Sequence, residues 1–267
     1  MTEPRINPKE MCPEVLFATP AVDHQFAVCF QRSMMETQWL LAQHGVTSGV
    51  LVRPGDCFVD KARNKLVGDF LVQFPYTENF FFLDDDIGWE PAKVLEFLRR
   101  PDPVVAGVYP KKSDSEDKWP CSFAVNEETG ELYEDQGMYL AVLAPPGFMR
   151  IKRNVLETLA AQASVFEDRE VDGRVVSYPY IFESGRGADG KYWGEDFTFC
   201  RKVREAGFPI WVDPNITFKH QGIRIWEDTL ANALPVFRHR AKLYAEGKID
   251  RETGDIIDDV EKSQAAA

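Results

Sequence analysis

Four apolar residues run directly into three consecutive aspartates, Asp84, Asp85 and Asp86. Residues 80–83 are apolar on both faces of an extended chain, which is typical of a central strand in a parallel sheet. Three carboxylates this close repel one another and raise one another's pKa, and a bound cation removes that cost. Oxygen ligands suit Mn²⁺ or Mg²⁺, with phosphates of a substrate completing the shell. Because side chains alternate along an extended segment, we expect Asp84 and Asp86 on one side and Asp85 on the other.

The rest of the chain places this strand in an α/β fold. Apolar runs at 15–19, 46–52, 80–83 and 104–108 alternate with helical patterns at 24–44, 60–73 and 91–99. This order predicts a mostly parallel, Rossmann-like central sheet flanked by helices. Ligands of such sheets gather at the carboxyl ends of the strands, where the aspartates lie.

Downstream of residue 110 the pattern loosens. Residues 111–140 indicate short antiparallel strands, and the glycine-rich stretch 166–192 indicates a mobile loop. Helical patterns return at 154–163, 195–206 and 230–246.

Composition excludes several classes of protein. The 267 residues carry a net charge of −12, so a basic footprint over the whole surface for nucleic acid is absent. Local basic groups at 111–112, 150–153 and 238–242 still allow local binding of a polyanion. Five widely spaced cysteines without a C-x-x-C pattern predict neither disulfides nor a zinc site. Without a signal segment or an 18-residue apolar run, we expect a cytoplasmic protein that does not contact a membrane.

A second acidic cluster, Glu195-Asp196, opens the helical pattern at 195–206. Acids in the first turn of a helix are favoured by its macrodipole, so helix capping is the simplest reading of this pair. His220 follows a short apolar run, and a single histidine in that position is more often structural than a metal ligand.

Taken together, these motifs resemble family-two-type glycosyltransferases with the GT-A fold. In that family an Ala-Arg-Asn segment opens a helix, as Ala62-Arg63-Asn64 does, and the next strand ends in Asp-x-Asp, as at Asp84-Asp85-Asp86. An acidic pair then opens a later helix, followed by Arg or Lys, Ala-Gly, a strand and a histidine. Here that series is Glu195-Asp196, Arg201, Ala206-Gly207, residues 210–212 and His220.

The resemblance implies a role for each matching residue. Asp84 contacts the ribose or the water shell of the metal, Asp86 binds the metal directly, and His220 is the third metal ligand. Asp196 is the candidate general base, with Glu195 as the supporting acid or as the base itself. The residues implied at the nucleotide sugar are Thr19, Pro20, Asp23, Arg63, Asn64, Asp84 and Asp85, and those on the acceptor side are Gly147, Trp193, Lys111 and Lys112.

The activity implied is metal-dependent transfer of a sugar from a nucleotide diphosphate sugar, a UDP-sugar first among them, to a hydroxyl acceptor with Mn²⁺ or Mg²⁺. Residues 107–112 and 148–152 also resemble short glycosyltransferases encoded by phages. That likeness points to hydroxymethylated pyrimidine in phage DNA as acceptor and to the host cytoplasm as location. A cell-surface or small-molecule glycan is the alternative acceptor.

We expect the chain to divide into an arm at 1–13, the GT-A domain that the family resemblance implies at 14–225, a C-terminal helix at 226–249 and an acidic tail at 250–267. The nucleotide-sugar half of the domain is 14–110, and the acceptor half is 111–225 with a small antiparallel sheet.

Three other functions remain open. Haloacid-dehalogenase-type phosphatases also place Asp-x-Asp after an apolar strand, although near the N-terminus. Nucleotidyltransferases share the fold type but need a glycine-rich phosphate loop, and residues 19–23 contain no glycine. A non-catalytic module that binds nucleotide sugars or glycans does not need the acids at 195–196.

Overall fold

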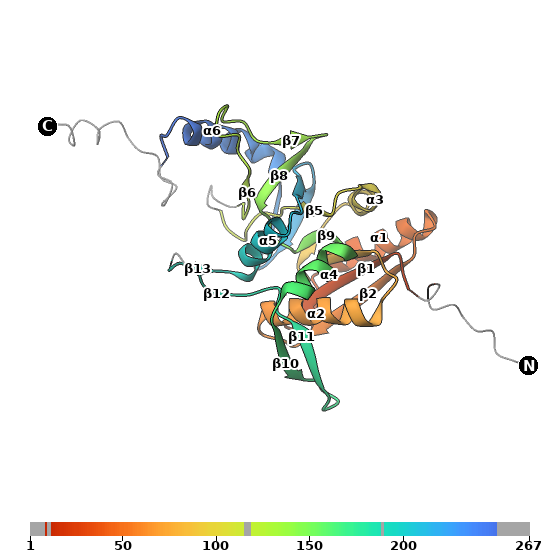
Figure 1. The fold of residues 1–267 in the computed structure, drawn as a ribbon. Coiled ribbons are helices and arrows are strands. Elements are labelled where there is room, and N and C mark those ends of the chain that lie inside the picture. The colour runs from red at the N-terminus through yellow and green to blue at the C-terminus, as the bar shows by residue number, and fades with distance from the viewer. Residues whose placement is uncertain (1–8, 10–11, 115–118, 188–189, 250–267) are drawn as a thin grey trace, which may run out of the picture.

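The structure is a computed structural model that describes residues 9, 12–114, 119–187 and 190–249. Its centre is a nine-stranded mixed sheet in the order β2-β1-β3-β9-β5-β14-β8-β6, with β7 also paired to β8 (Figure 1). The strands are β1 (Val15–Ala21), β2 (Ser48–Pro54), β3 (Asn79–Leu83), β5 (Val104–Gly107), β6 (Ser122–Phe123), β7 (Glu134–Asp135), β8 (Met138–Leu143), β9 (Phe148–Lys152) and β14 (Ile210–Asp213).

The predicted α/β class is confirmed, and the sheet is mixed because two strands, β9 and β8, run against the others. β1 pairs in parallel with β2 and with β3, and β5 pairs in parallel with β14. Between these groups lies β9, antiparallel to both β3 and β5. β1, β3 and β5 therefore still point the same way, and their carboxyl ends share one edge of the sheet.

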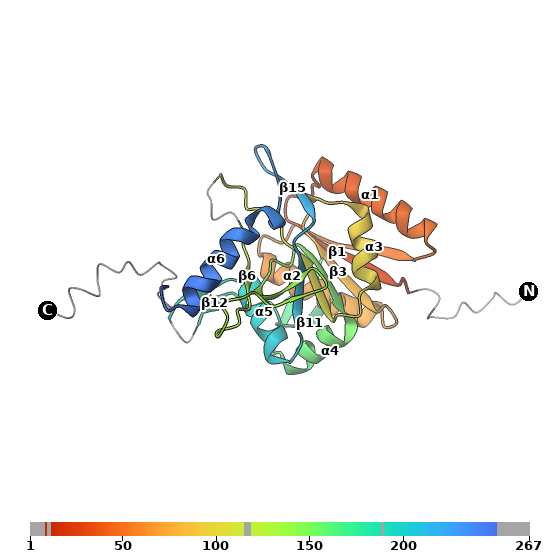
Figure 2. The ribbon, with the colours of Figure 1, turned by 90° about the horizontal axis from the view of Figure 1, so that it is seen from above.

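Helices cover both faces of this sheet (Figure 2). α1 (Val28–Gln43) and α3 (Pro91–Arg99) pack on one face against Phe17, Phe81 and Phe148. The other face, with Phe80 and Phe82, is covered by α2 (Val59–Gln73), α4 (Arg153–Gln162) and α5 (Glu195–Glu205). Phenylalanines 80 to 82 alternate between two cores, as a strand buried on both faces requires.

Within the stretch 166–192, the described residues 166–187 and 190–192 include paired strands, which corrects the mobile loop expected there. β10 (Val165–Arg169) and β11 (Val175–Pro179) form an antiparallel hairpin, and β12 (Gly185–Arg186) pairs with β13 (Tyr192–Trp193). The turn of the first hairpin contains Asp172-Gly173, with Gly173 at a φ of +85°. An Asp-Gly pair between apolar-alternating segments is a hairpin signal, and the number of glycines in the stretch concealed it.

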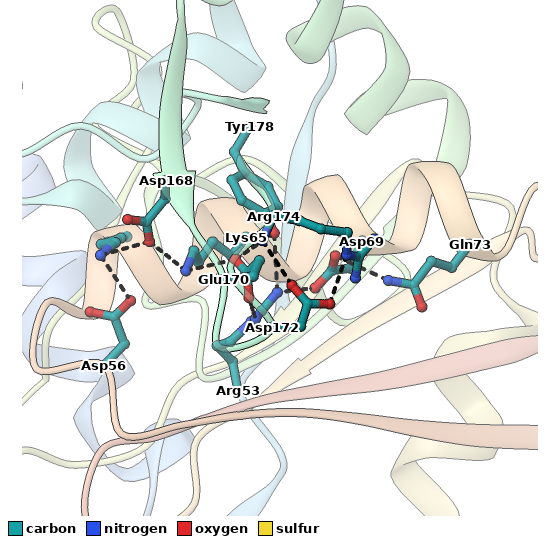
Figure 3. Close-up of polar contacts among 11 residues, drawn as sticks. Arg53, Asp56, Lys65, Asp69, Gln73, Asp168, Glu170, Asp172, Arg174 and Tyr178 are labelled. Carbon is teal, nitrogen blue, oxygen red and sulfur yellow. Dashed lines mark hydrogen bonds and ion pairs between the residues drawn. The ribbon is translucent and has the colours of Figure 1, made fainter. Parts of the chain in front are cut away.

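Ion pairs fasten this hairpin to α2 (Figure 3). Lys65 Nζ lies 2.5 Å from Asp168 Oδ2 and 2.9 Å from Glu170 Oε1. Arg53 from β2 lies 2.7 Å from Glu170 Oε2, and Tyr178 Oη donates to Glu170 Oε1 at 2.8 Å. Lys65 is buried, so its ammonium group must be paired with acids. Both acids come from the hairpin, and this requirement therefore holds the hairpin in one position against α2.

The C-terminal region also differs from the expectation of one helix over 226–249. β16 (Ile225–Thr229) pairs with β15 (Thr217–Gln221), which pairs with β4 (Ile87–Gly88) in a second, three-stranded sheet. A 3₁₀ turn, η1 (Leu230–Ala233), then leads into α6 (Leu234–Ala245). Pairing with β15 outweighs helix formation at 225–229. The acidic tail at 250–267 lies outside the described residues, as does most of the arm. In the described part of the chain, no helix is long and apolar enough to cross a membrane.

Asn64 on α2 fastens the segment 181–182 to the first half of the chain. Its Oδ1 accepts the backbone N–H groups of Ile181 and Phe182, each at 2.8 Å, and its Nδ2 donates to the Phe182 carbonyl at 2.8 Å. The side chain is fully buried. Asn64 thus supplies partners to backbone groups that no sheet satisfies.

We expect Asn64→Ala to lower the free energy of unfolding by about 2–4 kcal/mol, because it leaves these buried backbone groups unpaired. Urea unfolding followed by circular dichroism measures this loss. Asn154→Ala, an exposed asparagine on α4, is the matched control and should change stability by no more than about 0.5 kcal/mol. Equal stability of the two variants would contradict the role of Asn64.

Candidate functional site

The three aspartates lie where the carboxyl ends of β1, β3 and β5 meet. They form one wall of a cavity of about 280 Å³. Ligands of α/β sheets bind at this edge. The cavity is lined by Pro20, Val22, Asp23, Val59, Arg63, Asp84, Asp85, Asp86, Tyr109 and His220.

All three aspartates line this one cavity, which corrects the expectation that Asp85 faces the other way. β3 ends at Leu83, and residues 85–86 form a turn, so the side chains no longer alternate. Three backbone hydrogen bonds hold the turn. They run from Asp84 N–H to the Gly147 carbonyl at 2.9 Å, from Ala27 N–H to the Asp85 carbonyl at 2.9 Å, and from Gln221 N–H to the Asp86 carbonyl at 2.8 Å.

Asp84 is bound on both of its oxygens. Tyr109 Oη donates to Oδ2 at 2.5 Å, and Arg63 NH2 donates to Oδ1 at 3.1 Å. A methyl group at Gly147 would collide with the Asp84 carboxylate and the Tyr109 hydroxyl, so only glycine fits there. Burial and the neighbouring Asp84 charge raise the pKa of Tyr109 well above its usual value, and the hydroxyl stays a donor.

Arg63 connects the aspartates to the second acidic cluster. Its guanidinium is buried, and its Nε lies 3.7 Å from Glu195 Oε1, beyond hydrogen-bond distance. Among the residues that the structure describes, neither Nε nor NH1 has a hydrogen-bond partner. A buried guanidinium with two unused nitrogens at a cavity wall is a ready site for an anionic group such as phosphate.

Asp86 faces His220 and Lys112. His220 Nε2 lies 3.4 Å from Asp86 Oδ1, and Lys112 Nζ lies 2.5 Å from Asp86 Oδ2. Burial raises the pKa of Asp86, but hydrogen bonds from His220 and Lys112 outweigh it, and the pKa is lowered overall. His220 Nδ1 lies 2.7 Å from the Pro110 carbonyl. With a cation between His220 and Asp86, donation from Nδ1 to this carbonyl would leave the Nε2 lone pair for the metal, in place of the hydrogen bond from Nε2 to Asp86.

The donor set for a metal is only partly assembled. Two ligands at right angles on one divalent ion, with bonds of about 2.1 Å, stand roughly 3 Å apart, close to the Asp86–His220 separation. Asp84 is turned to Arg63 and Tyr109 instead. Among the residues described by the structure, no group of three or more His, Cys, Asp or Glu side chains is arranged to hold a metal ion. Asp86 and His220 fit a cation whose remaining ligands come from water and phosphate.

Asp85 is the aspartate of this turn whose pKa is raised. Burial, then the charges of Asp86 and Asp84, raises its pKa to about 6. A cation at the turn would favour its ionised form.

Glu195 and Asp196 begin α5 at this end of the sheet. Burial raises the pKa of Glu195, with the Arg63 charge opposing. Asp196 Oδ1 accepts the backbone N–H of Phe197 at 2.8 Å, as a residue at a helix start does. Glu195 therefore faces the buried guanidinium, and Asp196 is partly exposed beside it.

The residues implied for the nucleotide sugar divide into two groups. Pro20, Asp23, Arg63 and the aspartates line the cavity. Thr19 is buried in β1 with its hydroxyl unpaired, and Asn64 is bound to the backbone of 181–182. Neither Thr19 nor Asn64 reaches the wall of the cavity.

The residues implied for the acceptor are also distributed. Trp193 lines a different cavity, along α5. Gly147 and Lys112 instead touch Asp84 and Asp86, while Lys111 is exposed.

Two of the three basic side chains in segment 150–153, those of Arg150 and Arg153, are not available for binding phosphates. Arg150 is fully buried and donates to the backbone carbonyls of Phe97, Arg100 and Asp102 around the end of α3. Arg153 is buried and donates to the Thr77 carbonyl. The sequence shows that this segment is charged. It does not show that backbone carbonyls around the ends of α3 and α2 accept hydrogen bonds from these two guanidinium groups.

Tyr109 lines the site and bonds to Asp84, a contact that the sequence pattern did not predict. It follows β5 by two residues, as Asp84 follows β3 by one, so both arrive at the same edge of the sheet. That position was the available signal.

The raised pKa of Asp85 makes a prediction about pH. The folded state keeps a proton on Asp85 up to about pH 6, whereas the unfolded chain releases it near pH 4. The contribution of Asp85 to stability therefore falls as the pH rises from about 4 through 6. We expect Asp85→Asn to match the wild type near pH 4 and to be about 1 kcal/mol more stable at pH 7 without divalent cations, since partial exposure reduces the full linkage effect. Urea unfolding across this pH range measures the difference, and a gap independent of pH would contradict the assignment.

Comparison with known proteins leaves the chain without an assigned family. No protein-family model and no curated protein matches it. Among solved structures, it is similar to A197 from STIV, with 16% identity, a TM-score of 0.47, and coverage of 81% of this chain and 90% of that chain. It is also similar to a glycosyltransferase involved in the glycosylation of the major capsid of PBCV-1, with 13% identity, a TM-score of 0.32, and coverage of 55% of this chain and 62% of that chain. Both TM-scores are below 0.5, so the site itself must support any proposal about activity.

Proposed function

We propose that this protein is a glycosyltransferase that moves a sugar from a nucleotide diphosphate sugar, a UDP-sugar first among them, to a hydroxyl acceptor. The observation that supports it most is the buried Arg63 guanidinium. It joins Asp84 of the strand-end cluster to Glu195 of α5 and keeps two nitrogens for an anion. A diphosphate at this point would be bound by Arg63 on one side and Lys112 on the other.

In this proposal Asp86 and His220 hold Mn²⁺ or Mg²⁺, consistent with the 3.4 Å between their facing atoms. The cation supplies positive charge against the diphosphate of the donor. Asp84 stays with Arg63 and Tyr109 and orients the guanidinium.

Asp196 is our candidate base, and Glu195 positions Arg63. The acceptor oxygen forms a bond to the anomeric carbon, and the bond from that carbon to the diphosphate oxygen breaks. The hydroxyl proton passes to Asp196, and the electron pair leaves with the nucleoside diphosphate. Asp196 suits this role because it makes no ion pair with another described residue, whereas Glu195 faces the buried guanidinium.

Hydroxymethylated pyrimidine in phage DNA remains one acceptor within the proposal, with a glycan as the alternative. The burial of Arg150 and Arg153 removes one of the three basic segments that favoured DNA. The exposed basic side chains of segment 238–242 on α6 still favour DNA as the acceptor.

A thermal-shift series of UDP-, GDP-, dTDP- and ADP-sugars, with and without Mn²⁺, tests the donor. A ligand at 100 times its Kd stabilises the fold by about 2.7 kcal/mol. Release of the nucleoside diphosphate then reports turnover. If no nucleotide sugar raises the melting temperature under either condition, the proposal is wrong.

For the cation, we expect Asp86→Ala to weaken Mn²⁺-dependent donor binding at least about tenfold, because it removes a direct ligand. Calorimetric titration with the active donor measures this. Glu36→Ala, an exposed acid on α1, should bind as the wild type does. Unchanged Mn²⁺ dependence in Asp86→Ala would exclude Asp86 as a ligand.

For the base, we expect Asp196→Asn to retain donor affinity and to lower kcat by about 10²–10⁴-fold, the usual contribution of proton transfer. Glu195→Gln should mainly weaken donor binding, because Arg63 loses a charged neighbour. Steady-state kinetics with parallel binding measurements separates the two effects. If Glu195→Gln lowered kcat and Asp196→Asn weakened donor binding, Glu195 would be the base and Asp196 the positioning residue. Full activity in both variants would indicate a binding module.

A further inference from the structure

A second cavity, of about 590 Å³, lies along α5. It is about twice the size of the cavity at the aspartates and falls in the range of small-molecule sites. Its wall includes Leu143 and Tyr180, with Trp193 and Phe197 near the start of the helix. The rings of Trp193 and Phe197 meet edge to face at 5.3 Å, and both are partly exposed. They offer an apolar surface to a ring of a ligand.

Three arginines give this cavity a positive charge. Arg201 and Arg204 line it from α5, and Arg186 lines it from β12. All three are exposed, and no ion pair or side-chain hydrogen bond links any of them to another described residue. The one acid in the wall, Glu183, is paired with Lys202 at 2.9 Å. A local excess of cations contrasts with a chain whose net charge is −12.

Helix electrostatics accounts for only part of this cluster. Basic residues in the last turn of a helix are favoured by the macrodipole, and Arg204 is in that turn. Arg201 lies one turn earlier, and Arg186 comes from a different element. Their meeting at one cavity therefore needs a reason besides the helix dipole.

The cluster also lies at a useful distance from the candidate base. At 1.5 Å of rise per residue, Arg201 is about 7–8 Å and Arg204 about 12 Å along the axis from Asp196. Phe197, Arg201 and Arg204 are spaced i, i+4 and i+7, so they share a face of the helix. An anionic group held by these arginines would leave room along the axis for one sugar-sized ring before the start of α5, where Asp196 adjoins the lining residue Phe197 without itself lining the cavity.

We propose that this cavity binds the acceptor, and that the acceptor is a phosphate ester of a sugar or similar polyol; this step rests on the glycosyl transfer proposed above. Arginine binds phosphate through two parallel hydrogen bonds, and a phosphate dianion engages more than one guanidinium. A carboxylate, in contrast, is fully bound by the two parallel hydrogen bonds of one guanidinium group. The ring of the acceptor packs on Trp193, and its free hydroxyl faces Asp196.

Binding of glucose 6-phosphate, glucose and glucuronic acid to the full chain without donor tests this assignment. Calorimetry should show glucose 6-phosphate binding at least tenfold more tightly than either of the other two sugars. The double variant Arg201→Gln/Arg204→Gln should lose at least tenfold of that affinity. The matched control is Arg99→Gln, an exposed arginine on α3 outside the cavity, which should bind as the wild type does.

Three results would overturn the proposal. They are equal binding of glucose and glucose 6-phosphate, glucuronic acid binding as tightly as glucose 6-phosphate, and equal losses in the double variant and in Arg99→Gln. Binding of a 12-nucleotide single strand without binding of glucose 6-phosphate would also overturn it, in favour of a nucleic-acid acceptor.

The thermal shift with nucleotide sugars is measured on the same double variant. It should equal that of the wild type, because Arg201 and Arg204 lie outside the cavity at the aspartates. Loss of the donor shift in the wild type counts against glycosyl transfer, whereas loss of glucose 6-phosphate binding alone counts against the acceptor cavity. The two failures are thereby distinguished.

Discussion

The buried guanidinium of Arg63 is the constraint on which the site depends. A charge in the interior must be paired, and Arg63 is paired by Asp84 at 3.1 Å and approached by Glu195 at 3.7 Å. These acids come from β3 and α5, more than a hundred residues apart. The pairing that stabilises the arginine therefore also brings the two acidic clusters together. Two of its nitrogens have no hydrogen-bond partner in the described part of the chain, and the proposed binding of an anionic ligand rests on them.

Three consecutive residues of α2 contact three different parts of the fold. Arg63 faces the aspartates, Asn64 holds the backbone of 181–182, and Lys65 pairs with the β10–β11 hairpin. Segment 181–182 leads into Glu183 and Arg186 at the second cavity. Both cavities are thus positioned from one helix, and α5 joins them through Glu195 at its start and Arg201 and Arg204 along its length. In a two-substrate reaction, such coupling would fix the distance between the donor and acceptor sites.

The elements of the first half were predictable because their signals are local. Apolar runs and helical spacing place β1, β3 and β5 and the helices between them within a few residues of their observed bounds. The hairpin at 165–179 and β16 were not predicted, since each is stabilised by partners distant in sequence. The insertion of β9 between β3 and β5 was not predictable either, because strand order depends on pairing and not on periodicity.

The sequence by itself determined that three carboxylates follow a strand buried on both faces, and that Glu195-Asp196 opens a later helix. Both follow from residue type and spacing. Only the tertiary structure decided which side chains meet. It turned Asp84 toward Arg63 and Tyr109, left Asp86 to His220 and Lys112, and removed Arg150 from the surface. The physical reason is that burial and pairing of a charge depend on neighbours brought together by folding, and these neighbours are not adjacent in the sequence.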